Sequence, residues 1–248
     1  MSSTSVATTI STSTTTSTFR PSSARRIPVA GTPAVVVLSC ARDGDVGARS
    51  RAPVEVLEAR RRSLAAGRWR WLRQCHGDGV VVLDPEESCE GREADALVST
   101  VPGAPLAVFS ADCALVGLAS REGVVGAVHV GWRGLLAGVL ERTAATMGSV
   151  GATGIAAVVG ACIGPECYEF GEADLAPIEA RYGPSVSSRT SAGTPALDLR
   201  AGVHRALETA GVRVATDYAR CTACDPGWFS WRARRDSGRH ALVVATAP

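Results

Sequence analysis

Apolar residues run almost without a break in several short segments, a pattern typical of strands buried on both faces. We predict strands at 33–40 (PAVVVLSC), 124–130 (VVGAVHV), 155–160 and 241–245 (ALVVA). Residues 106–119 (LAVFSADCALVGLA) are predicted to form one or two more, and 69–83 a further β-like segment. A short polar loop at 41–47 follows the first strand.

Helical periodicity appears in three places. Residues 53–66 read as a helix, and 199–210 form a second one with Asp198 near its start and Gly211 at its end. After the turn 131–134 (GWRG), apolar residues recur at helical spacing from 135 to 147, with Gly148 as the expected C-cap. Strands and helices mix without regular βαβ alternation, so the fold class predicted is α+β with mixed sheets.

The first thirty residues differ from the rest of the chain. Residues 1–30 are rich in Ser and Thr, carry Arg20, Arg25 and Arg26, and contain no acid. A transit peptide shares this composition, but we favour a disordered extension. No later linker is visible, so residues 31–248 are predicted to form one catalytic domain.

Composition excludes several function classes. With 46% hydrophobic residues and a net charge of only +2, the chain lacks the basic character expected of a nucleic-acid binder. All 26 basic residues are Arg, so neither a Schiff-base lysine nor a P-loop lysine exists. No apolar run reaches membrane-spanning length, so we expect no membrane partner and a cytoplasmic location, where the eight cysteines stay reduced.

Two histidines and one cysteine are candidate metal ligands. His76 lies in a QCHGDG turn, Cys113 lies inside the buried SADCA segment, and His129 ends the VVGAVHV strand. Zinc binds thiolate and imidazole, and three protein ligands leave one position open, as catalytic sites do. From spacing alone the alternatives are that Cys113 is an apolar filler and that the histidines are hydrogen-bonded scaffolding.

Six strings in order resemble the laccase-domain family: QCHGDGV, EADALVST, SADCALV, GAVHVGWRGLLAGV, ACIGPECYEFG and CTACDPGWFSWR. Its bacterial members were first called multicopper polyphenol oxidases and are now regarded as purine nucleoside phosphorylases. The resemblance implies a single-domain four-layer α/β/β/α sandwich with Zn2+ on His76, Cys113 and His129, which would also be the catalytic residues. It further implies phosphorolysis of adenosine, inosine, guanosine and methylthioadenosine, and deamination of adenosine.

Phosphorolysis needs cations that hold phosphate, and guanidinium groups bind phosphate oxygens in bidentate fashion. Arg42, Arg133, Arg232 and Arg239 lie in or beside the family-like strings, and Arg42 is the first candidate because the family also has an Arg after its first strand. Glu169 is a candidate proton shuttle in the substrate site, with a structural ion pair as an equal alternative. Purine nucleosides and phosphate are therefore the expected small-molecule partners.

Some features leave the function open. The family's Gly-Gly-Val-Ser turn and Asn-bearing loop are missing after the first strand, and the segment around Ser237 is shortened. A copper-dependent polyphenol oxidase is one alternative, although four histidines are few for such copper sites. A catalytically inactive, zinc-stabilised accessory protein is another. Cys75 and the pair Cys221-x-x-Cys224 have no assigned role.

Overall fold

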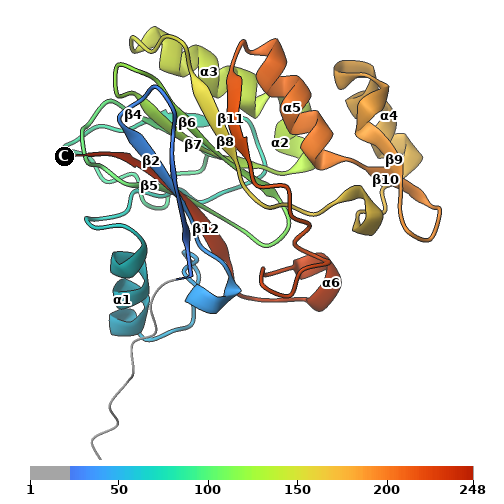
Figure 1. The fold of residues 1–248 in the computed structure, drawn as a ribbon, viewed down its shortest axis with the longest axis horizontal. Helices are drawn as coiled ribbons and strands as arrows, with labels where there is room; N and C mark the ends of the chain where they lie inside the picture. The colour runs from blue at the N-terminus through green and yellow to red at the C-terminus, as the bar shows by residue number, and fades with distance from the viewer. Residues whose placement is uncertain (1–22, 248) are drawn as a thin grey trace, which may run out of the picture.

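Two β-sheets lie face to face at the centre of the computed structural model, which describes residues 23–247 (Figure 1). One sheet is antiparallel, and its four strands have the order β1 (Arg25–Pro28), β2 (Ala34–Leu38), β12 (His240–Thr246) and β5 (Leu106–Ser110). The other has six strands in the order β11 (Arg213–Asp217), β8 (Ala156–Val159), β6 (Ala114–Ala119), β7 (Val125–Val130), β4 (Ala96–Ser99) and β3 (Val80–Val82). It is mixed, because β11 pairs with β8 and β3 pairs with β4 in parallel.

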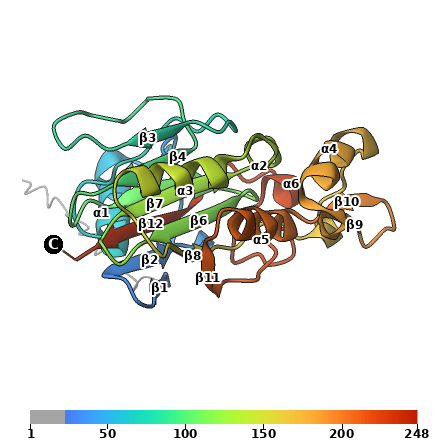
Figure 2. The ribbon, with the colours of Figure 1, turned by 90° about the horizontal axis from the view of Figure 1, so that it is seen from above.

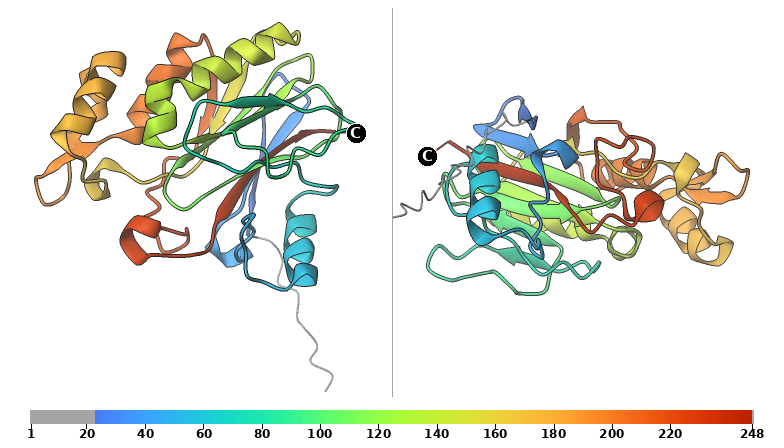
Figure 3. Two further views of the ribbon diagram at one scale, coloured as in Figure 1. Left: turned by 180° about the vertical axis from the view of Figure 1, so that it is seen from behind. Right: turned by 90° about the horizontal axis from the view of Figure 1, so that it is seen from below.

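Helices cover the outer faces of both sheets. The helices α2 (Trp132–Ala137), α3 (Val139–Ser149) and α5 (Leu199–Thr209) lie over the six-stranded sheet (Figure 2). On the opposite side, α1 (Val54–Leu64) lies over the four-stranded sheet (Figure 3). One end of the molecule carries α4 (Glu172–Tyr182), the short hairpin β9 (Ser187–Arg189) and β10 (Pro195–Leu197), and the 3-10 turns η2 (Pro165–Cys167) and η3 (Pro184–Val186). The remaining short elements are η1 (Ala41–Asp43) and α6 (Trp231–Arg234).

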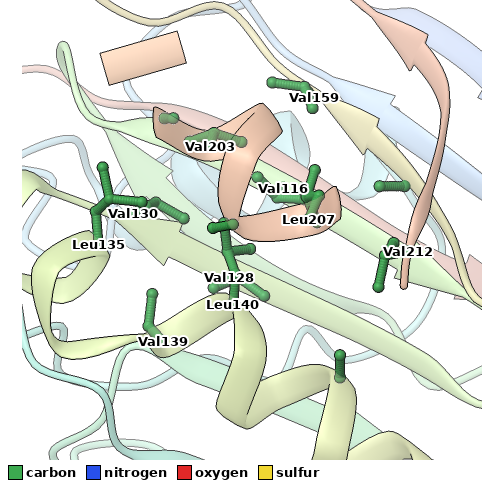
Figure 4. Packing of buried hydrophobic residues seen from close by; sticks show 14 of the residues in the cluster. Val116, Val128, Val130, Leu135, Val139, Leu140, Val159, Val203, Leu207 and Val212 are labelled. Carbon is green, nitrogen blue, oxygen red and sulfur yellow. The ribbon is translucent and has the colours of Figure 1, made fainter. Parts of the chain in front are cut away.

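Three hydrophobic cores separate these layers, and strand alternation assigns each side chain to one core. On β6, Val116 packs toward the helices, while Leu115 packs toward the second sheet. On β12, Leu242 faces the space between the sheets, and Val243 faces α1. The helix-side core is seen in Figure 4, where sheet valines meet α3 and α5. Four layers with three cores confirm the predicted single-domain α/β/β/α sandwich of α+β class.

Predicted strands at 33–40, 124–130, 155–160 and 241–245 are confirmed as β2, β7, β8 and β12. The run at 106–119 splits into β5 and β6, which belong to different sheets. Cys113 consequently lies on the connection that crosses between the sheets, not inside a strand. The β-like segment predicted at 69–83 contains a strand only at Val80–Val82, together with single bridges from Arg70 and Arg73.

Two predicted boundaries are wrong. The helix expected over 135–147 is interrupted at Gly138, which has a φ of +90° and ends α2 in the left-handed region where glycine costs least; Gly148 lies inside α3. The extension predicted for 1–30 includes Arg25–Pro28, which instead form β1 by pairing with β2. Residues 1–22 of that extension lie outside the described residues.

Candidate metal centre

His76, Cys113 and His129 lie together although the sequence separates them widely. Their ligand atoms are all within 4.8 Å of one another. Cys113 Sγ is 3.8 Å from His76 Nε2, and the two imidazole rings meet edge to face with centroids 4.9 Å apart. We call these three residues the His–Cys centre. His76 is exposed, Cys113 is half-buried and His129 is buried.

Strand pairing explains this convergence. His129 on β7 pairs with Leu115 on β6, and Cys113 directly precedes β6. His76 precedes β3, which adjoins β4, the other neighbour of β7. The central strand β7 therefore lies between the two elements that bring Cys113 and His76 alongside His129.

Asp95 holds the centre together. Its fully buried carboxylate accepts hydrogen bonds from the backbone N–H groups of Cys75 (3.2 Å), His76 (3.0 Å) and Gly77 (2.7 Å). The same carboxylate accepts from His129 Nδ1 at 2.8 Å. Since Nδ1 donates to Asp95, Nε2 of His129 is the nitrogen that a metal would bind in place of a proton, as in the carboxylate–histidine–metal arrangement of many sites.

Charge is distributed accordingly. Burial favours a neutral Asp95, but the hydrogen bond and charge of His129 outweigh it and lower the pKa of Asp95 to about 2. Burial also opposes ionisation of Cys113, yet the charge of His129 and hydrogen bonds with both histidines lower the pKa of its thiol to about 6. Burial lowers the pKa of His129, but the attraction of Cys113 and Asp95 raises it to about 9.

Strained backbone and two closely packed glycines shape the centre. His76 has a φ of 62° and Asp112, beside Cys113, has a φ of 108°; such conformations are costly for residues other than glycine and concentrate at functional sites. A Cβ at Gly131 would lie 2.6 Å from Cδ2 of His76, and one at Gly134 would lie 2.8 Å from the carbonyl oxygen of Gly77. Both glycines of the GWRG string therefore make room for the turn that carries His76.

Asp112 connects the centre to the C-terminal loops. Its carboxylate accepts a hydrogen bond from Thr222 Oγ1 at 2.7 Å and another from the backbone N–H of Arg232, also at 2.7 Å. Its carbonyl oxygen accepts from the N–H of Ile163 at 2.8 Å. The loops around 163 and 222–232 thus border the residue next to Cys113.

Two of the predicted phosphate ligands lie near the centre. Arg232 stacks on Tyr168 at 5.0 Å and donates to the carbonyl oxygen of Glu169 at 3.3 Å, and Arg133 stacks on Trp132 at 4.3 Å. Burial first, and then the negative charge of Cys113, raise the pKa of Tyr168, while the charges of Arg232 and Arg133 oppose this rise. Arg133 and Arg232 are both exposed.

The other predicted residues are placed differently. Arg42 is exposed on η1, whose first residue, Ala41, donates its N–H to the carbonyl oxygen of Gly227. The guanidinium of Arg239 donates to the carbonyl oxygens of residues 236, 237 and 238, so it braces its own loop. Glu169 is exposed and meets Arg232 through its carbonyl oxygen. The thiol of Cys75 donates to Asp95 at 3.2 Å, so its contact is with the supporting carboxylate.

Sequence reasoning missed Asp95 and Asp112. Both lie in strings quoted for the resemblance, EADALVST and SADCALV. A signal was present, because an acid set among small apolar residues at the end of a buried strand needs a partner. A hollow of about 540 Å³ between α4 and the β9–β10 hairpin is lined by other residues, including Leu175, Glu179 and Arg189.

The residues of the centre fit a metal ion. Two imidazoles and a thiolate form a donor set that suits zinc and related ions, and the hydrogen bond to Asp95 orients the nitrogen that would ligate. The group contains three residues of the described part of the chain, 23–247. This number suits a site that keeps a coordination position free.

Known proteins resemble the chain in sequence and in fold. A family model described as multi-copper polyphenol oxidoreductase laccase matches residues 44–247. Purine nucleoside phosphorylases of Mycobacterium tuberculosis and Streptomyces coelicolor are 38% and 39% identical over 184 and 181 residues, which cover 73% and 70% of this chain and 73% of each relative.

Solved structures share the fold. A Neisseria meningitidis protein of the DUF152 family superimposes with a TM-score of 0.77 at 23% identity, covering 91% of this chain and 99% of its own. YlmD from Geobacillus stearothermophilus does so with a TM-score of 0.76 at 25% identity, covering 89% and 94%. In residues 23–247, no helix is both long enough and apolar enough to traverse a membrane.

Proposed function

Because the chain belongs to the multi-copper polyphenol oxidoreductase laccase family, and relatives 38–39% identical to it are named purine nucleoside phosphorylases, we propose that it is a metal-dependent purine nucleoside phosphorylase. The observation that carries this proposal is the His–Cys centre with Asp95 behind it. Strained backbone at His76 and Asp112, of the kind that concentrates at functional sites, supports it.

In the proposed reaction, a phosphate oxygen bonds to C1′ of the ribose while the C1′–N9 bond breaks and the purine leaves with a proton. A divalent ion held by His76, Cys113 and His129 would supply Lewis-acid charge stabilisation. The chain contributes the rest: Asp95 fixes the tautomer of His129, and exposed guanidinium groups bind phosphate.

Arg133 and Arg232 are the best supported phosphate ligands, because Arg133 lies in the GWRG turn that follows His129, and Arg232 stacks on Tyr168 and donates its backbone N–H to Asp112, the neighbour of Cys113. The bonds of Arg239 to its own loop favour a supporting role. Arg42 and Glu169 remain predictions for phosphate binding and proton transfer. The full proposal includes adenosine, inosine, guanosine and methylthioadenosine as substrates, deamination of adenosine as a second activity, and the cytoplasm as the compartment that keeps the thiols reduced.

Purified protein loaded with Zn2+ tests the proposal directly. With inosine and phosphate it should release hypoxanthine and ribose 1-phosphate in equal amounts, and with adenosine it should release adenine as well as inosine. Arg232→Gln should raise the KM for phosphate more than the KM for inosine, and Arg235→Gln, an exposed arginine in the same loop, is its control. Absence of phosphate-dependent base release from a folded, metal-loaded preparation would refute the phosphorylase assignment.

Metal identity needs a separate measurement. We propose Zn2+, since the donor set contains one thiolate and only two imidazoles. Elemental analysis of Cys221→Ser protein expressed without added metal should find zinc, which in this variant reports mainly on the His–Cys centre. Stoichiometric copper, with oxidation of a phenol by the same preparation, would favour the oxidase alternative instead.

A further inference from the structure

A second group of metal-type ligands lies outside the His–Cys centre. Glu166, Cys167, Cys221 and Cys224 each present a ligand atom, and all four atoms are within 4.8 Å of one another. Cys224 Sγ is 3.3 Å from Cys167 Sγ and also 3.3 Å from Glu166 Oε1. Thiolates bound to one zinc ion lie about 3.8 Å apart, given Zn–S bonds of about 2.3 Å in a tetrahedron. We call these four residues the thiol cluster.

Backbone contacts hold the four side chains in place. The N–H of Gly164 donates to Cys221 Sγ at 3.2 Å, the kind of outer contact that orients thiolate ligands. Cys162 and Cys221 form a β-bridge, so the loops 162–169 and 218–230 are joined at the base of the cluster. The carboxylate of Glu166 occupies the space that a Cβ would take at Gly164.

The second loop is anchored independently. Arg234 donates to the carbonyl oxygens of Thr222, Ala223 and Trp228. These bonds fix the turn between Cys221 and Cys224 from its outer side. The ligand positions therefore do not depend on a metal to approach one another.

A disulfide is the competing explanation for close thiols. It would join only Cys167 and Cys224, and it would leave Cys221 and Glu166 unexplained. A metal site uses all four groups, and the C-x2-C spacing of Cys221 and Cys224 is a common zinc-ligand spacing. The number and type of donors thus favour a cation over a covalent bond.

We propose that Glu166, Cys167, Cys221 and Cys224 form a second, closed site for a thiophilic divalent cation of the zinc type. Four protein ligands fill a tetrahedron, so this site is structural. It links loop 162–169, which contains Tyr168, to loop 218–230, which precedes Arg232. Those two residues stack on each other beside the His–Cys centre, so the second ion stabilises the wall of the first site.

The test isolates the second site by removing the first. A His76→Ala/Cys113→Ser variant, depleted of metal under reducing conditions and reloaded with Zn2+, should bind one equivalent, against two for the wild type. Loaded with Co2+, it should show the near-ultraviolet charge-transfer band of thiolate ligation. Adding Cys221→Ser should weaken Zn2+ binding at least about 100-fold and lower the Co2+ band at saturation, because only two thiolates remain, whereas adding Cys40→Ser should change neither.

A gentler variant guards against misfolding. Glu166→Gln keeps all three thiols, so the Co2+ band should persist while Zn2+ affinity falls by about 10-fold. The proposal is overturned if the His76→Ala/Cys113→Ser protein binds no Zn2+, if Cys221→Ser leaves both the Co2+ band and the Zn2+ affinity unchanged, or if differential alkylation of reduced, metal-loaded protein finds the thiols of Cys167 and Cys224 unprotected.

Discussion

The two ligand groups of this protein are built in different ways. The His–Cys centre takes Cys113 and His129 from ends of strands and His76 from a turn, has mixed nitrogen and sulfur donors, and has a fully buried carboxylate behind it. The thiol cluster takes its residues from two loops, is dominated by sulfur, and is supported by backbone N–H and carbonyl groups. The first group has three ligands and strained backbone beside two of them; the second has four.

This difference matches the roles proposed for the two groups, a catalytic metal site for the first and a structural metal site for the second. An open coordination position needs a fixed ligand geometry that the metal itself does not complete, so the protein supplies rigidity through Asp95 and the central sheet. The thiol cluster instead lies on two loops, where backbone contacts to Gly164 and Arg234 hold its ligands in place. The comparison predicts that equivalent substitutions affect mainly activity in the first group and mainly stability in the second.

The largest contrast is expected between Cys113→Ser and Cys221→Ser. Loss of the Lewis acid from the His–Cys centre should lower kcat/KM for inosine by about 1000-fold, or ~4 kcal/mol of transition-state stabilisation. Cys221→Ser should lower kcat/KM by less than about 10-fold, mainly through the KM for phosphate, and should reduce the melting temperature. Steady-state kinetics and calorimetry on both variants measure this. Equal losses of activity would erase the distinction between the groups.

The next effect concerns the carboxylate behind His129. Asp95→Asn removes the charge that orients the imidazole and should weaken Zn2+ binding to the His–Cys centre by about 10–100-fold. The matched control is Asp217→Asn, because Asp217 also holds a histidine, His204, at 2.7 Å but outside both ligand groups. Competition with a chromogenic chelator gives both affinities. Similar losses in the two variants would mean that Asp95 acts only through general stability.

The sequence shows why one group was predictable and the other was not. Apolar runs identified most strands of the two sheets, because strands buried on both faces leave little choice of residue. Family-like strings named His76, Cys113 and His129, although spacing alone left each as a plausible core residue. The pair Cys221-x-x-Cys224 has no second C-x-x-C pair in the sequence. Its partners are Glu166 and Cys167, and Cys167 lies 57 residues before Cys224.

Other features depend on tertiary contacts that no local pattern contains. The split of 106–119 between two sheets follows from the turn at Asp112, whose φ of 108° is sustained by Thr222 and the backbone of Arg232. The break between α2 and α3 at Gly138 interrupts a regular helical period. The role of Asp95 depends on three N–H groups from a turn some twenty residues earlier in the chain.

A smaller change tests the packing around His76. Gly131→Ala places a methyl group against the imidazole, which should shift the ring and weaken Zn2+ binding to the His–Cys centre by about 10-fold, or ~1.4 kcal/mol. Gly148→Ala is the control, since its added Cβ meets nothing within 4 Å and lies in α3, where alanine should be neutral or stabilising. Chelator competition on both variants decides the point. Unchanged affinity in Gly131→Ala would show that the ring position is not critical.

The smallest effect is on the pH dependence of stability, and it compares His240, which is buried without a ligand role, with His129. His240 is buried against Trp228, with ring centroids 5.1 Å apart, and neither ring nitrogen has a hydrogen-bond partner within residues 23–247. Burial, aided by the charge of Arg239, lowers the pKa of His240 from 6.5 to about 3. Below pH 6.5 the imidazole of His240 therefore binds a proton in the unfolded chain but not in the folded chain. The free energy of unfolding is highest above that pH and falls as the pH drops. Between pH 7.5 and 6.0 this should cost about 1 kcal/mol of unfolding free energy.

His240→Phe keeps the ring contact with Trp228 and removes the titration. Urea unfolding at the two pH values should show a smaller loss of stability on acidification for the variant than for the wild type, by the amount given above, while protonation of the metal ligands affects both proteins alike. His129 has the opposite response, since Cys113 and Asp95 favour its charged form. An identical acid dependence in wild type and His240→Phe would show that the His240 site admits a proton in the folded state, and the contrast between the two buried histidines would then be lost.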